Sequence, residues 1–250
     1  MRRKPPPLVL AYHGIGDVSR RDDPRGLVVS EDELRRHVGK LRSWGYELLT
    51  FGGLAARVAA GDARGCAALT FDDGFADDGA AFSRLAVPAT VFAVSGWLGA
   101  THPDVPAARI VTADELRSLA RSGVEIGAHT HTHPDLTRLG YEGARAELAE
   151  SKRRLEEILD RAVEVASYPY GRADAETLRA CRDAGFTAAC RISGEGSWDD
   201  LHNLPRQDMD RGATTFGLRL KRENLYERTV ATFPGRAARA AVRQVRLRQR

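Results

Sequence analysis

The sequence predicts an α/β fold, a distorted (β/α) barrel of about seven strands that is TIM-like. The chain has 250 residues, a length that one barrel domain commonly fills. Hydrophobic residues make up 42% of it, enough for a sizeable core. Short apolar runs alternate with longer amphipathic ones, and repeated βα units of this kind require a parallel sheet with crossover helices. About seven units exceed what a small open sheet needs, so a doubly wound open sheet is the second choice.

Each element follows from a local pattern. The apolar runs predict strands at 7–12, 46–51, 67–71, 89–94, 124–128, 163–168 and 186–192. Between them, Ser30 with Glu33 has the spacing of a capping box, in which the hydroxyl and the carboxylate satisfy each other's backbone donors at a helix start. Thr112 with Glu115 has the same spacing. Residues 141–160 place their apolar side chains on one face and charges on the rest, which predicts a helix.

The charge is unevenly distributed. The formal net charge is +4, but residues 234–250 contain six arginines and no acid, and Arg2, Arg3 and Lys4 add three more positive charges. Removing these nine leaves −5 on residues 5–233, which we expect to be the folded domain, with 234–250 as a basic C-terminal tail. The basic average is therefore no reason to expect nucleic acid as a partner. A helical tail could contact an anionic membrane or an acidic partner; a solvated terminus is the simpler interpretation.

Cysteine usage and hydropathy bear on location. Cys66, Cys181 and Cys190 cannot all pair, and none stands in a CxxC arrangement, so we expect reduced, mostly buried thiols. The apolar run 8–12 is shorter than the about 7 to 15 residues of a signal-peptide core, and no run approaches the about 18 needed to span a bilayer. These features predict a cytoplasmic location, unless an export signal has been trimmed from the sequence.

Polar residues follow the predicted strands, where the active site of a barrel is built. They are His13 after the first strand, Asp72 and Asp73 after the third, His129, His131 and His133 after the fifth, Tyr170 after the sixth, and Arg206 after the last apolar run.

Adjacent carboxylates such as Asp72 and Asp73 raise each other's pKa unless a positive group neutralises them, and a divalent metal does this well. One Asp can bind the metal while its neighbour takes a proton from water. A solvated Asp-Asp-Gly turn is the plainer interpretation of this stretch alone.

Three of the seven histidines lie within residues 129–133, and imidazole is the usual nitrogen ligand of zinc. An extended segment would put all three on one side, whereas a helical turn would align His129 with His133; spacing alone does not choose. One Asp and two His form a three-ligand set with open positions, the pattern of a catalytic zinc site. The scattered cysteines do not suggest a structural one.

Together, the TFDDG stretch at 70–74, the HTHTH stretch at 129–133 with Pro134, and the Pro-Tyr-Gly turn at 169–171 resemble the polysaccharide deacetylases of the NodB-homology family, carbohydrate esterase family 4. The resemblance spans about residues 8 to 210. It implies a distorted (β/α) barrel and a metal-dependent removal of acetyl groups from N-acetylated, sometimes O-acetylated, sugars.

By this resemblance, Asp72 matches the general base and Asp73, His129 and His133 match the ligands of a divalent metal, with zinc expected. The middle histidine of the three falls at a variable position. Tyr170 matches the residue whose backbone amide helps to hold the oxyanion, where preorganised donors contribute most.

One departure concerns the cation beside the general base. The family usually has an Arg two residues before the Pro of the Pro-Tyr turn, and this chain has Ser167 there. Arg206 is the candidate replacement, and we group it with Tyr170 on the substrate-binding side of the site; a plain surface Arg is the alternative.

A second departure concerns the general acid. The family's late Leu-x-His motif is absent, since no histidine follows His202. Instead Tyr12-His13-Gly14 ends the first strand, which resembles the rearranged branch typified by poly-N-acetylglucosamine deacetylases, where the acid comes from the N-terminal strand. We therefore expect His13 to be the general acid, with His202 as the fallback.

The expected function is removal of N-acetyl groups from N-acetylglucosamine-type sugars or polysaccharides, with release of acetate. A deacetylase of a small or lipid-linked amino sugar is the first alternative, and Trp97, Trp198 and Tyr170 could stack on a sugar ring or simply pack. A non-catalytic carbohydrate-binding barrel is the second alternative, favoured only by Ser167.

Overall fold

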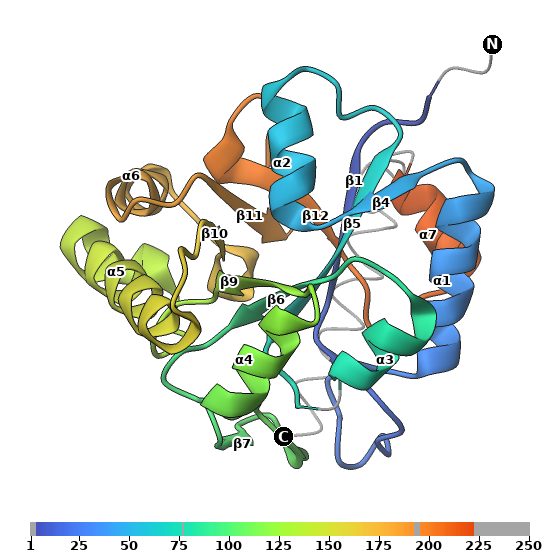
Figure 1. Ribbon diagram of the computed structural model, residues 1–250, viewed down its shortest axis with the longest axis horizontal. Helices are drawn as coiled ribbons and strands as arrows, with labels where there is room; N and C mark the ends of the chain where they lie inside the picture. Colours follow the sequence, from blue (N-terminus) through green and yellow to red (C-terminus); the bar gives the residue numbers. More distant parts are fainter. Residues whose placement is uncertain (1–3, 77, 193–195, 223–250) are drawn as a thin grey trace, which may run out of the picture.

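The centre of the molecule is a closed barrel of seven parallel strands, shown in Figure 1. The computed structural model describes residues 4–76, 78–192 and 196–222. Around the barrel the strands are β1 (Leu8–Tyr12), β12 (Leu204–Asp208), β11 (Ala188–Ile192), β10 (Val165–Ser167), β9 (Glu125–Ala128), β6 (Thr90–Ala93) and β5 (Cys66–Asp73), which pairs with β1. The predicted (β/α) barrel is confirmed, and the open doubly wound sheet is not formed.

One of the seven barrel strands differs from those predicted. The run at 46–51 forms only the short strand β4 (Glu47–Leu49), which is not one of the seven barrel strands. It pairs with the first residues of β5, and β6 pairs with the later residues of β5. Thr50 already caps the next helix, which cuts this strand short. The remaining barrel strand is β12, which was not predicted because it contains Pro205 and few apolar residues.

Helices surround the barrel (Figure 1). They are α1 (Glu31–Ser43), α2 (Phe51–Ala59), α3 (Asp78–Leu85), α4 (Ala113–Arg121), α5 (Gly140–Leu159), α6 (Ala175–Asp183) and α7 (Thr215–Arg222). Both predicted capping boxes are present, at Ser30 for α1 and at Thr112 for α4, and α5 lies within one residue of its predicted bounds. Among the described residues, no helix combines the length and the apolar character needed to cross a membrane.

The described part of the chain also contains two small sheets and three 3-10 turns. A parallel pair, β2 (Gly14–Ile15) and β3 (Val28–Val29), follows β1. An antiparallel hairpin, β7 (Thr101–His102) and β8 (Val105–Arg109), lies between β6 and α4. The 3-10 turns span Leu136–Arg138, Pro169–Gly171 and Leu201–Asn203.

The barrel interior is apolar at one end and polar at the other. Side chains from the barrel strands pack with Phe51 and Leu54 of α2 in an apolar cluster. The ring of Phe92 fills the space beside Gly127, where an added Cβ would lie 2.5 Å from the ring. Cysteines contribute to the core as predicted, since Cys66, Cys181 and Cys190 are all free and buried. Towards the carboxyl ends of the strands the interior becomes polar.

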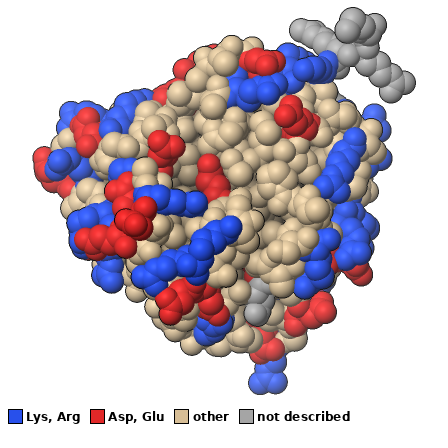
Figure 2. Space-filling model, viewed as in Figure 1, with Lys and Arg blue, Asp and Glu red and all other residues tan. Residues whose placement is uncertain are grey.

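Charges on the surface are mixed in sign. Figure 2 shows one face, on which Lys and Arg side chains are interspersed with Asp and Glu around a largely uncharged centre. Arg109 pairs with Glu115 at 2.7 Å, an example of this mixing. The basic tail predicted at 234–250 lies outside the described residues.

Candidate metal and catalytic site

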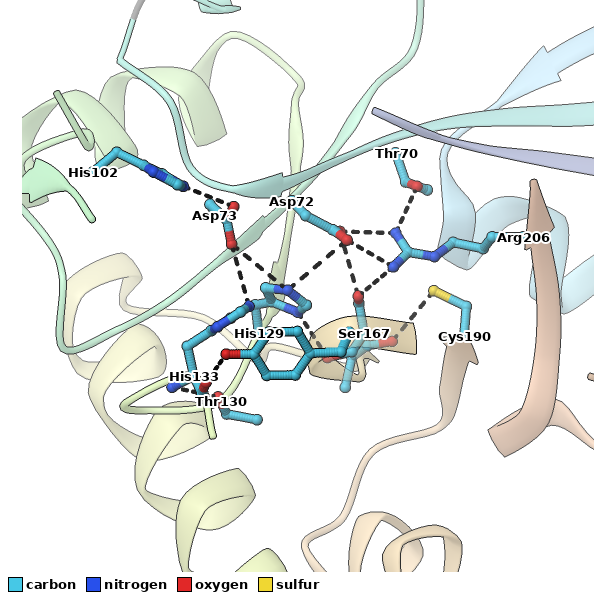
Figure 3. Close-up of polar contacts among 12 residues, drawn as sticks. Thr70, Asp72, Asp73, His102, His129, Thr130, His133, Ser167, Cys190 and Arg206 are labelled. Atoms are coloured by element: carbon cyan, nitrogen blue, oxygen red, sulfur yellow. Dashed lines mark hydrogen bonds and ion pairs between the residues drawn. The ribbon is translucent and has the colours of Figure 1, made fainter. Parts of the chain in front are cut away.

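Asp72, at the end of β5, is held inside the barrel by Arg206 of β12. The guanidinium donates one hydrogen bond of 2.8 Å to each carboxylate oxygen and another of 2.9 Å to Oγ1 of Thr70 (Figure 3). Burial alone raises the pKa of Asp72, but the charge of Arg206, the nearby His129 and the hydrogen bonds from Arg206 outweigh burial and lower this pKa below its ordinary value. Asp72 is therefore a buried carboxylate that is ionised at neutral pH.

Ser167, at the end of β10, completes this contact. Its hydroxyl accepts a 2.6 Å hydrogen bond from Nη2 of Arg206 and donates to Oδ1 of Asp72 at 3.3 Å. Position 167 carries no cation in this chain, and Arg206 of β12 supplies the guanidinium beside Asp72 instead. Arg206 has no exposed area, so its position favours steadying Asp72 over direct contact with a substrate.

Asp73, His129 and His133 bring three potential ligand atoms together within 4.8 Å of one another. Oδ1 of Asp73 lies 3.7 Å from Nε2 of His129 and 3.6 Å from Nε2 of His133. For comparison, ligand atoms about 2.1 Å from a tetrahedral zinc are about 3.4 Å apart. The same Oδ1 is buried and accepts no hydrogen bond from any described residue. A buried carboxylate oxygen without a donor fits a cation ligand, so these residues could hold a divalent metal.

Both histidines present a lone pair to this point. The Nδ1–H of His129 donates to the backbone carbonyl of Ser167 at 2.9 Å, and because a carbonyl only accepts, Nε2 is left as the potential ligand. Burial, and then the nearby His129, lower the pKa of His133 to about 4. His133 is therefore neutral at neutral pH, as a metal-binding imidazole must be.

The backbone of the loop after β9 selects these two histidines. Thr130 and His133 have left-handed φ values of 67° and 63°, which fold the segment into neither a strand nor a helix. Glu147 of α5 accepts hydrogen bonds of 2.9 Å from the backbone N–H groups of His131 and Thr132. The ring of His131 faces Ser95, with 3.0 Å between Nδ1 and Oγ, so His131 does not join the group formed by Asp73, His129 and His133.

Left-handed backbone is concentrated at this site. Asp73 and Tyr170 also have positive φ, of 69° and 59°, so four of the six described non-glycine residues with positive φ belong to it. Such conformations cost of order 1–3 kcal/mol each and persist where the surrounding structure holds them, often at functional sites.

His13 follows β1 at the level of the carboxylates. Tyr12 pairs with Phe71, so His13 and Asp72 occupy the next positions on neighbouring strands. Burial raises the pKa of Asp73, but the hydrogen bond from His102 and the nearby imidazoles of His13, His129 and His133 together outweigh burial and lower this pKa strongly. The imidazole of His13 makes no hydrogen bond with another described residue, so it is available to a bound molecule.

Aromatic rings flank the potential metal ligands. The rings of Trp97 and Tyr170 each lie 4.9 Å from the ring of His133, and Tyr170 is 53% exposed. Trp198 instead packs against the apolar cluster that includes α2. His202 is also placed elsewhere, with Nε2 2.8 Å from the carbonyl oxygen of Phe186.

Sequence reasoning missed His102, whose Nε2 lies 3.0 Å from Oδ2 of Asp73. It does not follow a barrel strand, and it reaches the site only because the β7–β8 hairpin folds back over the end of β5. No signal in the sequence alone indicates this contact.

The comparisons agree with this geometry. The family model for polysaccharide deacetylase matches residues 60–189. The chain is 27% identical over 184 residues to a protein of Bacillus subtilis (strain 168) named "Putative polysaccharide deacetylase YxkH"; the match covers 71% of this chain and 61% of that protein.

The fold is also found in solved structures of other proteins. Streptococcus pyogenes deacetylase PplD, in complex with acetate, aligns with a TM-score of 0.72 and 22% identity over 86% of this chain and 96% of that one. The de-N-acetylase from Aggregatibacter actinomycetemcomitans aligns with a TM-score of 0.68 and 19% identity over 85% of this chain and 98% of that one.

Proposed function

Because the chain belongs to the polysaccharide deacetylase family, we propose that it is a metal-dependent hydrolase that removes N-acetyl groups from N-acetylglucosamine-type sugars. The observation that carries the proposal is the different surroundings of two adjacent carboxylates. Asp72 is paired with Arg206 at 2.8 Å, whereas Asp73 has a buried oxygen without a donor beside two imidazole nitrogens. One carboxylate is thereby suited to proton transfer and the other to binding a cation.

Asp73, His129 and His133 would hold the metal, and their oxygen and nitrogen atoms suit zinc. A divalent metal in this position supplies Lewis-acid activation of the acetyl carbonyl and of the attacking water. The tautomer of His129 and the neutral state of His133 prepare both Nε2 atoms for this role.

The remaining steps belong to side chains of this chain. Asp72 accepts a proton from the water that attacks the acetyl carbon, and Arg206 keeps Asp72 ionised until then. The backbone amide of Tyr170 donates to the oxyanion. His13 then gives a proton to the sugar nitrogen as the carbon–nitrogen bond breaks, which yields acetate and a free amine.

A small or lipid-linked amino sugar is the alternative substrate, because Trp97 and Tyr170 offer ring faces for a single sugar beside His133. The non-catalytic binding barrel loses its one supporting feature, since Arg206 makes the contact that Ser167 cannot. We assign catalysis to residues 5–233. For the tail 234–250, contact with an anionic membrane or an acidic partner stays a prediction, as does the cytoplasmic location.

The test is acetate release from a panel of monosaccharide, nucleotide-sugar, lipid-linked and oligomeric N-acetylglucosamine substrates. We expect release by zinc-reconstituted protein and none after chelation, with recovery when zinc is restored. Release from oligomers alone supports a polymer substrate, and release from the smaller compounds supports the alternative. Binding of the sugars without acetate release from any of them would contradict the enzyme assignment.

A further inference from the structure

We propose that His102 is a positioning residue that fixes the carboxylate of Asp73 for metal binding. The inference rests on the proposed function, because it concerns the same metal site. His102 acts through Asp73 and is not itself a ligand.

The hydrogen bonds of His102 determine its tautomer. The backbone N–H of Asp104 donates to Nδ1 at 3.1 Å, so Nδ1 carries a lone pair and Nε2 carries the hydrogen. Nε2–H then donates to Oδ2 of Asp73 at 3.0 Å. Because Oδ2 accepts this hydrogen bond, Oδ1 is the carboxylate oxygen of Asp73 that stays available, and it is the atom that faces His129 and His133.

Aromatic packing holds the imidazole in this orientation. His102 is 2% exposed. The ring of Phe75 stacks on its imidazole with 4.7 Å between the ring centroids, and the ring of Trp97 forms a T-shaped contact with it at 5.7 Å between centroids. Trp97 also lies against the ring of His133. The segment between β6 and α4 therefore contacts two of the three potential ligands.

The hairpin is tied to β5 directly beyond Asp73. The N–H of Val111 donates to the carbonyl of Gly74 at 2.9 Å, and the N–H of Ala76 donates to the carbonyl of Arg109 at 2.9 Å. These bonds fix the distance between the hairpin and Asp73. A carboxylate held in this way loses less rotational freedom when a cation binds, which is how an outer hydrogen bond raises metal affinity.

Zinc affinity of the purified apoprotein, measured by competition with a chromophoric chelator, tests the proposal. We expect His102→Leu to weaken zinc binding about 10- to 100-fold. His102→Gln keeps an N–H donor and should recover part of the loss. The matched control is His37→Leu. His37 is also 2% exposed, and its two ring nitrogens contact the Tyr12 hydroxyl and the Ala213 carbonyl. The His37→Leu variant should bind zinc with the affinity of the parent protein. Equal affinity of His102→Leu and the parent would overturn the proposal.

If His102→Leu does not fold, the tautomer of His102 in the parent gives a second test. Nitrogen-15 NMR of the apoprotein should show hydrogen on Nε2 and none on Nδ1, and the Nε2 resonance should shift when zinc is added. Hydrogen on Nδ1 would overturn the proposal.

These outcomes separate the inference from the function on which it rests. If the parent protein binds no zinc and releases no acetate, both the proposed function and the role of His102 are contradicted. If the parent binds zinc and releases acetate, but His102→Leu has the same zinc affinity as the parent, only the role of His102 is contradicted.

Discussion

Arg206 donates one hydrogen bond of 2.8 Å to each carboxylate oxygen of Asp72, across the barrel interior and 134 positions away in the sequence. The two residues lie on strands that are not neighbours, so closure of the barrel is what brings them together. The contact places two adjacent carboxylates in different surroundings. The charge of Asp72 is satisfied by a guanidinium, whereas Oδ1 of Asp73 accepts no hydrogen bond from any described residue.

Arg206→Met should destabilise the protein and impair catalysis. Removing one partner of a buried ion pair typically lowers the free energy of unfolding by about 3–5 kcal/mol, because the other charge stays buried. Acetate release per folded molecule should also fall, since Asp72 loses its fixed orientation. The measurements are denaturant unfolding and acetate release, with Arg117→Met as control. Arg117 donates to the carbonyl of Ile158 outside the barrel, and its replacement should leave turnover unchanged.

Moving the guanidinium from position 206 to position 167 tests whether Asp72 can be paired equally well from β10 and from β12. Ser167→Arg alone should lower stability, because a second buried guanidinium has no carboxylate of its own. The double variant Ser167→Arg, Arg206→Ser should exceed both single variants in stability and acetate release. A double-mutant cycle measures this coupling, and a double variant no better than the two singles combined would show that only β12 can deliver the cation.

The elements that could be predicted from sequence are those fixed by local patterns. The capping boxes at Ser30 and Thr112 and the apolar face of α5 depend on neighbours three or four residues away, so periodicity reveals them. Ligand candidates were also recognisable, because Asp73, His129 and His133 follow predicted strands. The choice of His129 and His133 over His131 required the left-handed turns of the loop, which spacing does not encode.

Two features depended on tertiary structure and were missed or left open. β12 contains Pro205 and became recognisable as a strand only between β11 and β1, so the position of Arg206 inside the barrel could not be inferred from its surroundings in sequence. His102 lies 29 positions from Asp73 and meets it through the β7–β8 hairpin. Neither contact has a periodicity that sequence analysis can detect.

His13→Ala should show the signature of a missing general acid. Turnover of an N-acetyl sugar should fall by about 10²- to 10⁴-fold, because the departing amine needs a proton. Turnover of 4-nitrophenyl acetate should fall far less, since its leaving group departs as a stable anion. His202→Ala is the matched control and should leave both rates near the parent values, because the ring of His202 binds the carbonyl of Phe186. An equal loss on both substrates after His13→Ala would contradict the acid assignment.

The three cysteines should resist thiol reagents while the protein is folded. Burial raises the pKa of Cys181 to about 12, so almost no thiolate is present at pH 8, and Cys66 and Cys190 are also buried. A chromogenic disulfide reagent should therefore report very little reaction at pH 8 before denaturation and three thiols after it. Rapid reaction of the native protein would show that a thiol is accessible.

Metal content and acetate release, measured on the same preparations of Asp72→Asn and Asp73→Asn, test the division of labour between the two carboxylates most directly. We expect Asp72→Asn to keep its zinc while turnover falls by about 10²- to 10⁴-fold, and Asp73→Asn to lose both zinc and turnover. Full turnover in Asp72→Asn, or undiminished zinc in Asp73→Asn, would contradict the account.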